Sequence, residues 1–225
     1  MTARMRVFFV AIAAPALVLA AAIARAQEPP PRIGPFVVDL HGTVPRFPSD
    51  DPQLALSRGM DLAELPGTGL GIQVGAHVYL LHVKVITFGV GAEFAAGRSR
   101  ETPPAGATSA TTGQPLRPSE ERFSTISPQL SFNFGNGHGW SYLSGGLGTS
   151  NRAVVPQGQE GFPADSENLK TLNYGGGARW FAKSHLAFSL DVRIYVIAPG
   201  TPFLAGAPGS PRTNLLVIGA GISLK

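Results

Sequence analysis

Hydrophobic and polar residues alternate with a period of two along much of this chain. In residues 186–198, LAFSLDVRIYVIA, every even position is apolar, whereas the odd positions include Asp191 and Arg193. Successive side chains of a β-strand point to opposite faces, so this stretch predicts a strand with one apolar face and one polar face. No stretch after residue 26 shows the period of an amphipathic helix, and we therefore predict an all-β protein.

Eight stretches of this kind follow one another along the chain. They cover residues 34–44, 67–81, 84–97, 121–134, 140–150, 168–181, 186–198 and 212–224. The connections alternate in length: residues 45–66, 98–120, 151–167 and 199–211 are long, and the turns near residue 82, at 135–139 and at 182–185 are short. Short turns predict antiparallel hairpins, and the alternation places all the long connections at one end of the sheet.

Eight alternating strands are compatible with two kinds of barrel. In a soluble periplasmic barrel of the lipocalin type the apolar faces line the interior, whereas in a transmembrane barrel they contact lipid. Charged residues make up only 14% of this chain, against about a quarter in soluble domains. The polar faces are rich in glycine, as a narrow interior requires, at Gly69, Gly71, Gly75, Gly89, Gly91, Gly175, Gly177, Gly219 and Gly221. We therefore predict an eight-stranded antiparallel up-and-down transmembrane β-barrel and keep the soluble barrel as the alternative.

This layout resembles the small eight-stranded outer-membrane β-barrel family typified by the transmembrane domain of outer-membrane protein A. The resemblance covers residues 34–225 and rests on the even strand number, the short turns and the long loops. It implies export through the periplasm into a Gram-negative outer membrane, with the barrel-assembly machinery and outer-membrane lipid as partners. The chain departs from the family at its end, where Ile222-Ser223-Leu224-Lys225 stands in place of the usual terminal aromatic residue.

The N-terminal segment predicts export. Arg4 and Arg6 precede an apolar run that ends in the small-x-small sequence of residues 24–26, so we predict a signal peptide over 1–26, a short lead over 27–33 and the barrel over 34–225. An uncleaved anchor helix is the alternative. Without residues 1–26 the basic residues fall from 18 to 15 against 14 acidic ones, so the net charge is +1 and we infer no nucleic-acid partner.

Two sets of side chains are candidates for a special role. Charged residues on the polar faces predict a network that fills the interior, or alternatively a gate, and comprise Glu93, Arg179, Asp191, Arg193, Asp39 and His41. Aromatic residues near the short turns predict half of a membrane-interface girdle, and comprise Tyr79, Phe134, Trp140, Tyr142, Trp180 and Phe181.

Catalytic chemistry has little support in the sequence. The chain has no cysteine, its five histidines lack metal-ligand spacing, and no phosphate-binding loop precedes a helix, so we predict no metal and no cofactor. Asp39, His41 and Ser189 are the parts of a Ser–His–Asp triad, but nothing in the sequence brings them together. We predict a non-enzymatic structural or surface-contact role through four long extracellular loops whose partner the sequence does not name. The alternatives are a narrow conduit for small or hydrophobic solutes and a lipid A-modifying barrel enzyme.

Overall fold

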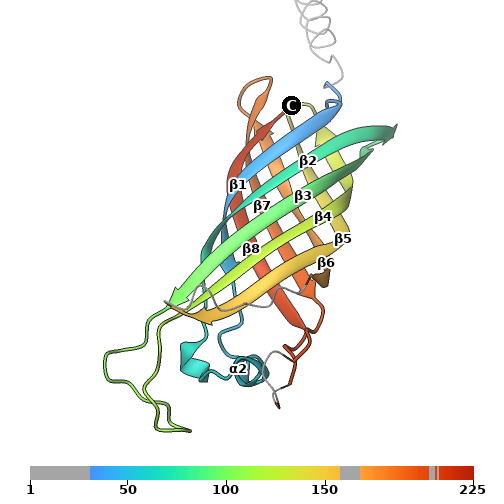
Figure 1. Ribbon diagram of the computed structural model, residues 1–225. Coiled ribbons are helices and arrows are strands. Elements are labelled where there is room, and N and C mark those ends of the chain that lie inside the picture. The colour runs from blue at the N-terminus through green and yellow to red at the C-terminus, as the bar shows by residue number, and fades with distance from the viewer. Residues whose placement is uncertain (1–30, 158–167, 203–205, 207) are drawn as a thin grey trace, which may run out of the picture. The chain divides into compact units, whose positions relative to one another are not determined.

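The computed structural model describes residues 31–157, 168–202, 206 and 208–225, so the predicted signal peptide lies outside the described residues. Residues 32–225 form one compact unit, a closed barrel of eight antiparallel strands in which each strand pairs with its sequence neighbours (Figure 1). The strands are β1 (Phe36–Arg46), β2 (Leu70–Val83), β3 (Ile86–Glu101), β4 (Ser119–Asn136), β5 (Gly139–Pro156), β6 (Leu169–Phe181), β7 (Leu186–Ile197) and β8 (Thr213–Leu224). The barrel closes where β1 pairs with β8, from Val38 opposite Leu224 to Arg46 opposite Leu216. The predicted fold class is confirmed.

The strand bounds differ from the prediction mainly at the long-loop end. β3 continues to Glu101, β4 begins at Ser119, and β5 continues to Pro156, so these strands run further than the alternation of apolar residues indicated. The extensions consist largely of charged and small residues, which carry no period-two hydrophobic signal. Their backbones nevertheless pair, with Glu101 opposite Ser119 and Ser119 opposite Pro156.

No amphipathic helix pattern was found after residue 26, but the structure contains two short helices there. The first long connection contains α2 (Pro52–Arg58) and the short 3-10 helix η1 (Leu62–Glu64). Local capping explains α2, because Asp51 accepts hydrogen bonds from the backbone N–H groups of residues 53 and 54 at 2.9 and 3.1 Å, and Gly59 ends the helix at φ 62°. Seven residues are too few for a helical period to be detected in the sequence. Among the described residues, no helix has both the length and the hydropathy to cross a membrane.

The apolar faces of the strands point outward. Large hydrophobic side chains on this surface include Leu70, Leu80 and Leu147, which are 75%, 68% and 71% exposed. The alternating residues of the same strands are buried, and in β7 the burial changes at almost every residue. A soluble barrel would bury the apolar faces and leave the charged ones in water. The soluble lipocalin-like alternative is therefore wrong.

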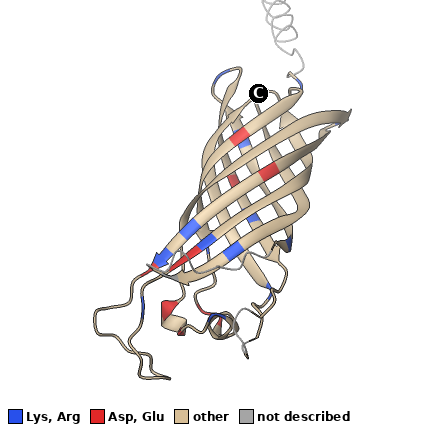
Figure 2. Ribbon diagram, viewed as in Figure 1, with Lys and Arg blue, Asp and Glu red and all other residues tan. Residues whose placement is uncertain are grey.

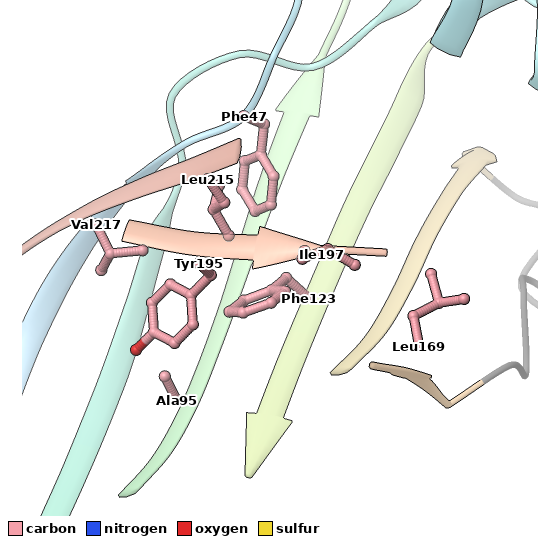
Figure 3. Packing of buried hydrophobic residues seen from close by; sticks show 8 residues of the cluster. All are labelled: Phe47, Ala95, Phe123, Leu169, Tyr195, Ile197, Leu215 and Val217. Atoms are coloured by element: carbon pink, nitrogen blue, oxygen red, sulfur yellow. The ribbon is translucent and has the colours of Figure 1, made fainter. Parts of the chain in front are cut away.

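The lumen is filled in three layers. An apolar cluster next to the short turns contains Ile33, Val37 and Trp140, with Tyr79 and Phe181 packed against it. A polar layer lies in the middle of the barrel. A second apolar layer lies toward the long loops (Figure 3) and consists of Phe47, Ala95, Phe123, Leu169, Tyr195, Ile197, Leu215 and Val217.

Two glycines let β4 and β5 approach closely beside Pro128. A Cβ atom on Gly146 would lie 1.9 Å from the carbonyl oxygen of Pro128, and one on Gly148 would lie 2.1 Å from that of Ile126. Proline has no N–H to donate to the ladder, and the pairing of β4 with β5 is interrupted between Ile126 and Leu130. The wall stays closed at this irregular point because glycine leaves room for the opposite backbone.

Candidate functional site

The first interior ion pair joins β6 to β1 across the lumen. Arg179 Nε and Nη2 donate to Asp39 Oδ1 and Oδ2 at 2.8 and 2.6 Å, and Ser223 Oγ donates to Asp39 Oδ1 at 2.5 Å. The guanidinium carbon of Arg179 also lies 3.8 Å from the ring centre of Tyr142. Paired hydrogen bonds between a guanidinium and a carboxylate are among the strongest polar contacts in proteins. Both charges are therefore held in one fixed arrangement.

A second ionic group occupies the middle of the barrel. Arg193 Nε lies 2.9 Å from Glu93 Oε2, and its Nη2 lies 3.3 Å from Asp191 Oδ2. Tyr142 and Tyr195 donate their hydroxyl protons to Asp191 at 2.6 Å and to Glu93 at 2.7 Å. Each buried carboxylate thus receives a neutral donor in addition to the arginine. This satisfies more of its acceptor capacity than the ion pair alone.

Amides and hydroxyls connect the ionic group to the wall. Gln73 donates to both Glu93 and Asp191, at 3.0 and 3.3 Å. On the other side, Gln129 donates to Asn173 Oδ1 at 2.6 Å, and Arg193 donates to Ser144 Oγ at 2.8 Å. These residues were not among the predicted site residues, although each lies on the polar face of its strand. Position on that face was the signal that could have found them.

The structure places all six predicted interior charges inside the barrel, but their pairing was not readable from the sequence. Five of them form the two ionic groups just described. The sixth, His41, shares a hydrogen bond with Ser189 Oγ at 2.7 Å through its Nε2 atom. Its Nδ1 atom is buried and has no hydrogen-bond partner among the described residues.

Only two of the three candidate triad residues are therefore in contact. His41 and Ser189 are in contact, but both carboxylate oxygens of Asp39 are engaged by Arg179, and Ser223 also donates to one of them. A catalytic triad needs the carboxylate to orient the imidazole. Ser189 is also fully buried in the filled lumen, out of reach of a substrate. Within the described part of the chain, no group of three or more His, Cys, Asp or Glu side chains is arranged to hold a metal ion.

The aromatic girdle prediction is wrong for four of its six members. Trp140 and Tyr142 are only 2% and 3% exposed and point into the lumen, and Tyr79 packs edge-on against Trp140 with ring centres 6.1 Å apart. Phe181 stacks on Trp140 at 4.9 Å, at the rim of the same cluster. Phe134 and Trp180 do lie on the outward face, 38% and 51% exposed. The four errors have one cause, because these residues were selected by their nearness to the short turns and not by the face of the strand on which they lie.

At the end with the long loops, a further ion pair lies inside the barrel. Arg152 Nε donates to Glu121 Oε1 at 2.5 Å, and its Nη1 donates to Thr213 Oγ1 at 2.6 Å. Beyond them, Leu54 and Ala55 of α2 and Leu65, which follows η1, pack against Val154 of β5. Side chains therefore fill the barrel from the aromatic cluster to the loops. A barrel of eight strands has an interior of a size that side chains can fill, and the described residues fill much of it in this way.

The first two long loops form one ordered unit outside the barrel. Ser109 Oγ donates to Asp61 Oδ2 at 2.5 Å, and the backbone N–H of Arg117 donates to Glu64 Oε1 at 2.6 Å. The hydroxyl of Ser109 and the N–H of Ala63 both hold the pKa of the Asp61 carboxyl below its usual range. A hollow of about 910 Å³ lies between α2, η1 and residues 109–117. Two exposed leucines, Leu56 and Leu62, line it.

Comparison with known proteins decides the structural class. No family model matches the sequence, and no curated protein matches it. The crystal structure of Neisserial surface protein A (NspA) aligns with a TM-score of 0.51 at 12% identity, covering 85% of this chain and 97% of that one. The fold is that of the small outer-membrane barrels. OprG of Pseudomonas aeruginosa (TM-score 0.48, 11% identity, 87% and 97% covered) and the attachment invasion locus protein Ail of Yersinia pestis (0.47, 14%, 86% and 100%) align less well.

An outer-membrane barrel fixes the orientation of the parts described above. The belt of exposed apolar side chains faces lipid, which explains why residues such as Leu70 and Leu147 have no protein cover. In this fold the short turns face the periplasm and the long loops face the outside of the cell. The hollow between α2, η1 and residues 109–117 lies at the end of the barrel that carries the long loops (Figure 1).

Proposed function

We propose that this protein is a closed outer-membrane barrel that presents its extracellular loops for contact with a partner outside the cell. The observation that carries the proposal is the division of the molecule into a filled lumen and an ordered loop unit with an open hollow. A barrel of eight strands has room for side chains or one small ligand, and here side chains take that room. Function then belongs to the loops, which are the parts of a rigid scaffold that most often bind.

The loop unit has features of a binding surface. Asp61, Glu64, Ser109 and Arg117 hold the first two loops together through hydrogen bonds, so the hollow keeps its shape without a ligand. Leu56 and Leu62 are 62% and 41% exposed there. Exposed apolar side chains grouped on a loop surface favour contact with a partner. Preorganised concave surfaces with apolar floors and polar rims favour ligand contact. Insertion by the barrel-assembly machinery is part of this proposal.

The conduit alternative is tested first, by single-channel recording of the refolded mature protein in a planar bilayer. We expect no discrete conductance, because the ionic groups of Arg179 and Arg193 and both apolar layers block the axis. Regular conductance steps would contradict the proposal and favour the conduit.

Contact is tested on whole cells that display the protein. Cells carrying the wild type are compared with cells carrying Leu56→Asp/Leu62→Asp for adherence to surfaces coated with extracellular-matrix proteins. We expect the double variant to lose adherence while its surface level and heat-modifiable gel mobility stay unchanged. The matched control is Leu147→Asn/Leu172→Asn on the lipid-facing wall, which leaves the loops intact. Equal adherence of cells with and without the protein would overturn the proposed contact role.

A further inference from the structure

The ionisable side chains at the short-turn rim of the barrel are all basic. The described residues of this rim are the lead 31–35, the turns 82–85, 135–139 and 182–185, and residue 225. None of them is Asp or Glu, and their ionisable side chains are those of Arg32, His82, Lys84, His138, Lys183, His185 and Lys225. Figure 2 shows Lys and Arg but neither Asp nor Glu at the short turns.

The cations of the short-turn rim have no anionic partner in the described part of the chain. No described residue forms an ion pair with Arg32, Lys84 or Lys183. Lys225 donates to the carbonyl oxygen of Gly137, and its Nζ atom lies 3.8 Å from the ring centre of Phe181. These two contacts leave the charge of the lysine unneutralised, so the rim presents uncompensated positive charge.

The cations surround the barrel. The turns β2–β3, β4–β5 and β6–β7 and the seam between β8 and β1 follow one another around the closed sheet. Lys84 lies in the first of these turns and Lys183 in the third, with two strands between them on either side. They therefore lie on opposite sides of the barrel. Charges placed around a transmembrane wall face the surrounding lipid leaflet, whereas one small ligand could reach only one of them.

The turn that carries Lys84 also exposes apolar side chains. Lys84 and Val85 form the two-residue turn between the ladder partners Val83 and Ile86, and Val83 and Val85 are 46% and 72% exposed. A turn that projected into water would expose two valines beside the lysine. At a membrane boundary, the valines contact acyl chains while the lysine extends its ammonium group to the headgroups.

The turn that carries Lys183 follows an outward aromatic pair. Trp180 stacks on Phe188 with ring centres 6.1 Å apart, and the two residues are 51% and 52% exposed. Tryptophan is enriched where the hydrocarbon region of a membrane meets the headgroups. Lys183 comes three residues after Trp180, in the turn itself, and therefore lies at the level of the headgroups on the periplasmic side.

We propose that the short-turn rim binds acidic phospholipids of the periplasmic leaflet of the outer membrane. Uncompensated basic side chains at a membrane surface attract lipids with a net negative charge, such as phosphatidylglycerol, over the zwitterionic phosphatidylethanolamine. The valines beside Lys84 and the aromatic pair before Lys183 supply contacts for acyl chains, which a soluble anion lacks.

The test uses Trp180 as a local reporter of lipid composition. The chain has two tryptophans, and Trp140 is buried in the lumen, so Trp180 is the one that contacts lipid. The refolded mature protein is placed in phosphatidylethanolamine vesicles that contain phosphatidylglycerol as the minor lipid, with brominated acyl chains on one lipid or on the other. Bromine quenches the fluorescence of a tryptophan that it contacts. The two measurements therefore give the ratio of phosphatidylglycerol to phosphatidylethanolamine beside Lys183.

We expect this ratio to be about fivefold higher beside the wild-type protein than in the bulk lipid, because one basic side chain at a membrane surface contributes about 1 kcal/mol. Lys183→Gln should bring the ratio close to the bulk value. The matched control is Lys170→Gln, which removes the same charge from the opposite end of β6 and should leave the ratio unchanged. High salt should abolish the enrichment, because it screens exposed charges.

Three results would overturn the proposal. They are a bulk lipid ratio beside wild-type Trp180, an enrichment that Lys183→Gln retains in full, and an enrichment that persists in high salt. The first of these would leave the rim to a soluble anionic partner. Heat-modifiable mobility shows that each variant is folded.

The β2–β3 turn is tested with the reporter moved. Trp180→Phe/Val83→Trp places the tryptophan beside Lys84, and Lys84→Gln in this background should lower the enrichment as Lys183→Gln does at the other turn. No change on Lys84→Gln would contradict lipid binding around the whole rim. If this double variant does not fold, Val85→Trp takes the place of Val83→Trp, because Val85 is the more exposed of the two valines.

Discussion

Arg179 on β6 binds both carboxylate oxygens of Asp39 on β1, at 2.8 and 2.6 Å, although 140 residues separate the two in the chain. In the closed barrel, β7 and β8 lie between these strands in the wall. The contact therefore crosses the lumen and does not follow the wall. It ties opposite sides of the barrel together and helps to block the axis.

Removing one partner of this pair should destabilise the barrel strongly. Arg179→Met leaves Asp39 buried without its cation, and breaking a buried pair in this way costs about 3–5 kcal/mol. We expect the midpoint of urea unfolding, followed by tryptophan fluorescence of the refolded protein in lipid vesicles, to fall accordingly. The double variant Asp39→Asn/Arg179→Met leaves no isolated charge and should regain part of the loss. A single variant as stable as the wild type would contradict the interlocking role of the pair.

The hydroxyl of Tyr142 should contribute more to the free energy of unfolding than the hydroxyl of a tyrosine on the outer wall. Tyr142→Phe removes the 2.6 Å hydrogen bond to Asp191 but keeps the ring beside Arg179. Leaving a buried acceptor without its donor lowers the free energy of unfolding by about 1–3 kcal/mol. The matched control is Tyr174→Phe on the neighbouring strand β6, because Tyr174 is 47% exposed on the outward face. Equal stability of the two variants would show that the interior hydrogen bond contributes nothing.

Replacement of glycine by alanine should have different effects on folding at two glycines of the barrel wall. Gly146→Ala would place its Cβ 1.9 Å from the carbonyl oxygen of Pro128, so β4 and β5 must separate. Gly42→Ala places its Cβ 3.9 Å from its nearest neighbour, the carbonyl oxygen of Ala220, which is an ordinary contact. We expect Gly146→Ala to reduce the yield of heat-modifiable folded protein and Gly42→Ala to leave it unchanged. Normal folding of both would contradict the close approach of β4 and β5 at Pro128.

Acid should loosen the loop unit through Asp61. Its pKa is lowered in the folded protein by the Ser109 hydroxyl and the Ala63 N–H, so the stabilising contact is fully present above the ordinary value of 3.8. The contribution is lost only as the pH falls through the lower, folded pKa. We expect protease cleavage within residues 107–117 to be constant between pH 7 and pH 5 and to increase below 3.8.

Asp61→Asn is the control for this titration. Asparagine keeps an acceptor for Ser109 but does not ionise, so the acid-dependent increase in cleavage should become smaller. An increase already present near pH 6 would point to a different group and would contradict the assignment to Asp61.

The sequence by itself determined the strands of this protein. Hydrophobic alternation is a local property, so the eight segments, their antiparallel order and the shared face of Asp191 and Arg193 were all readable from it. Segments without hydrophobic alternation could not be predicted in this way. The charged extensions of β3, β4 and β5 and the capped seven-residue helix α2 carry no long apolar period, and these were the elements missed or cut short.

Only the tertiary structure decided which side chains meet. Barrel closure sets the register of strands that are distant in the chain, so it alone pairs Asp39 with Arg179 and gives Arg193 both Glu93 and Asp191. The inward facing of Trp140 and Tyr142, in contrast, was readable from the sequence, because both alternate with the outward Leu143 and were assigned to the membrane interface only for their nearness to the short turns. Partnership depends on how the sheet closes in space, and a period of two along the chain carries no information about that closure.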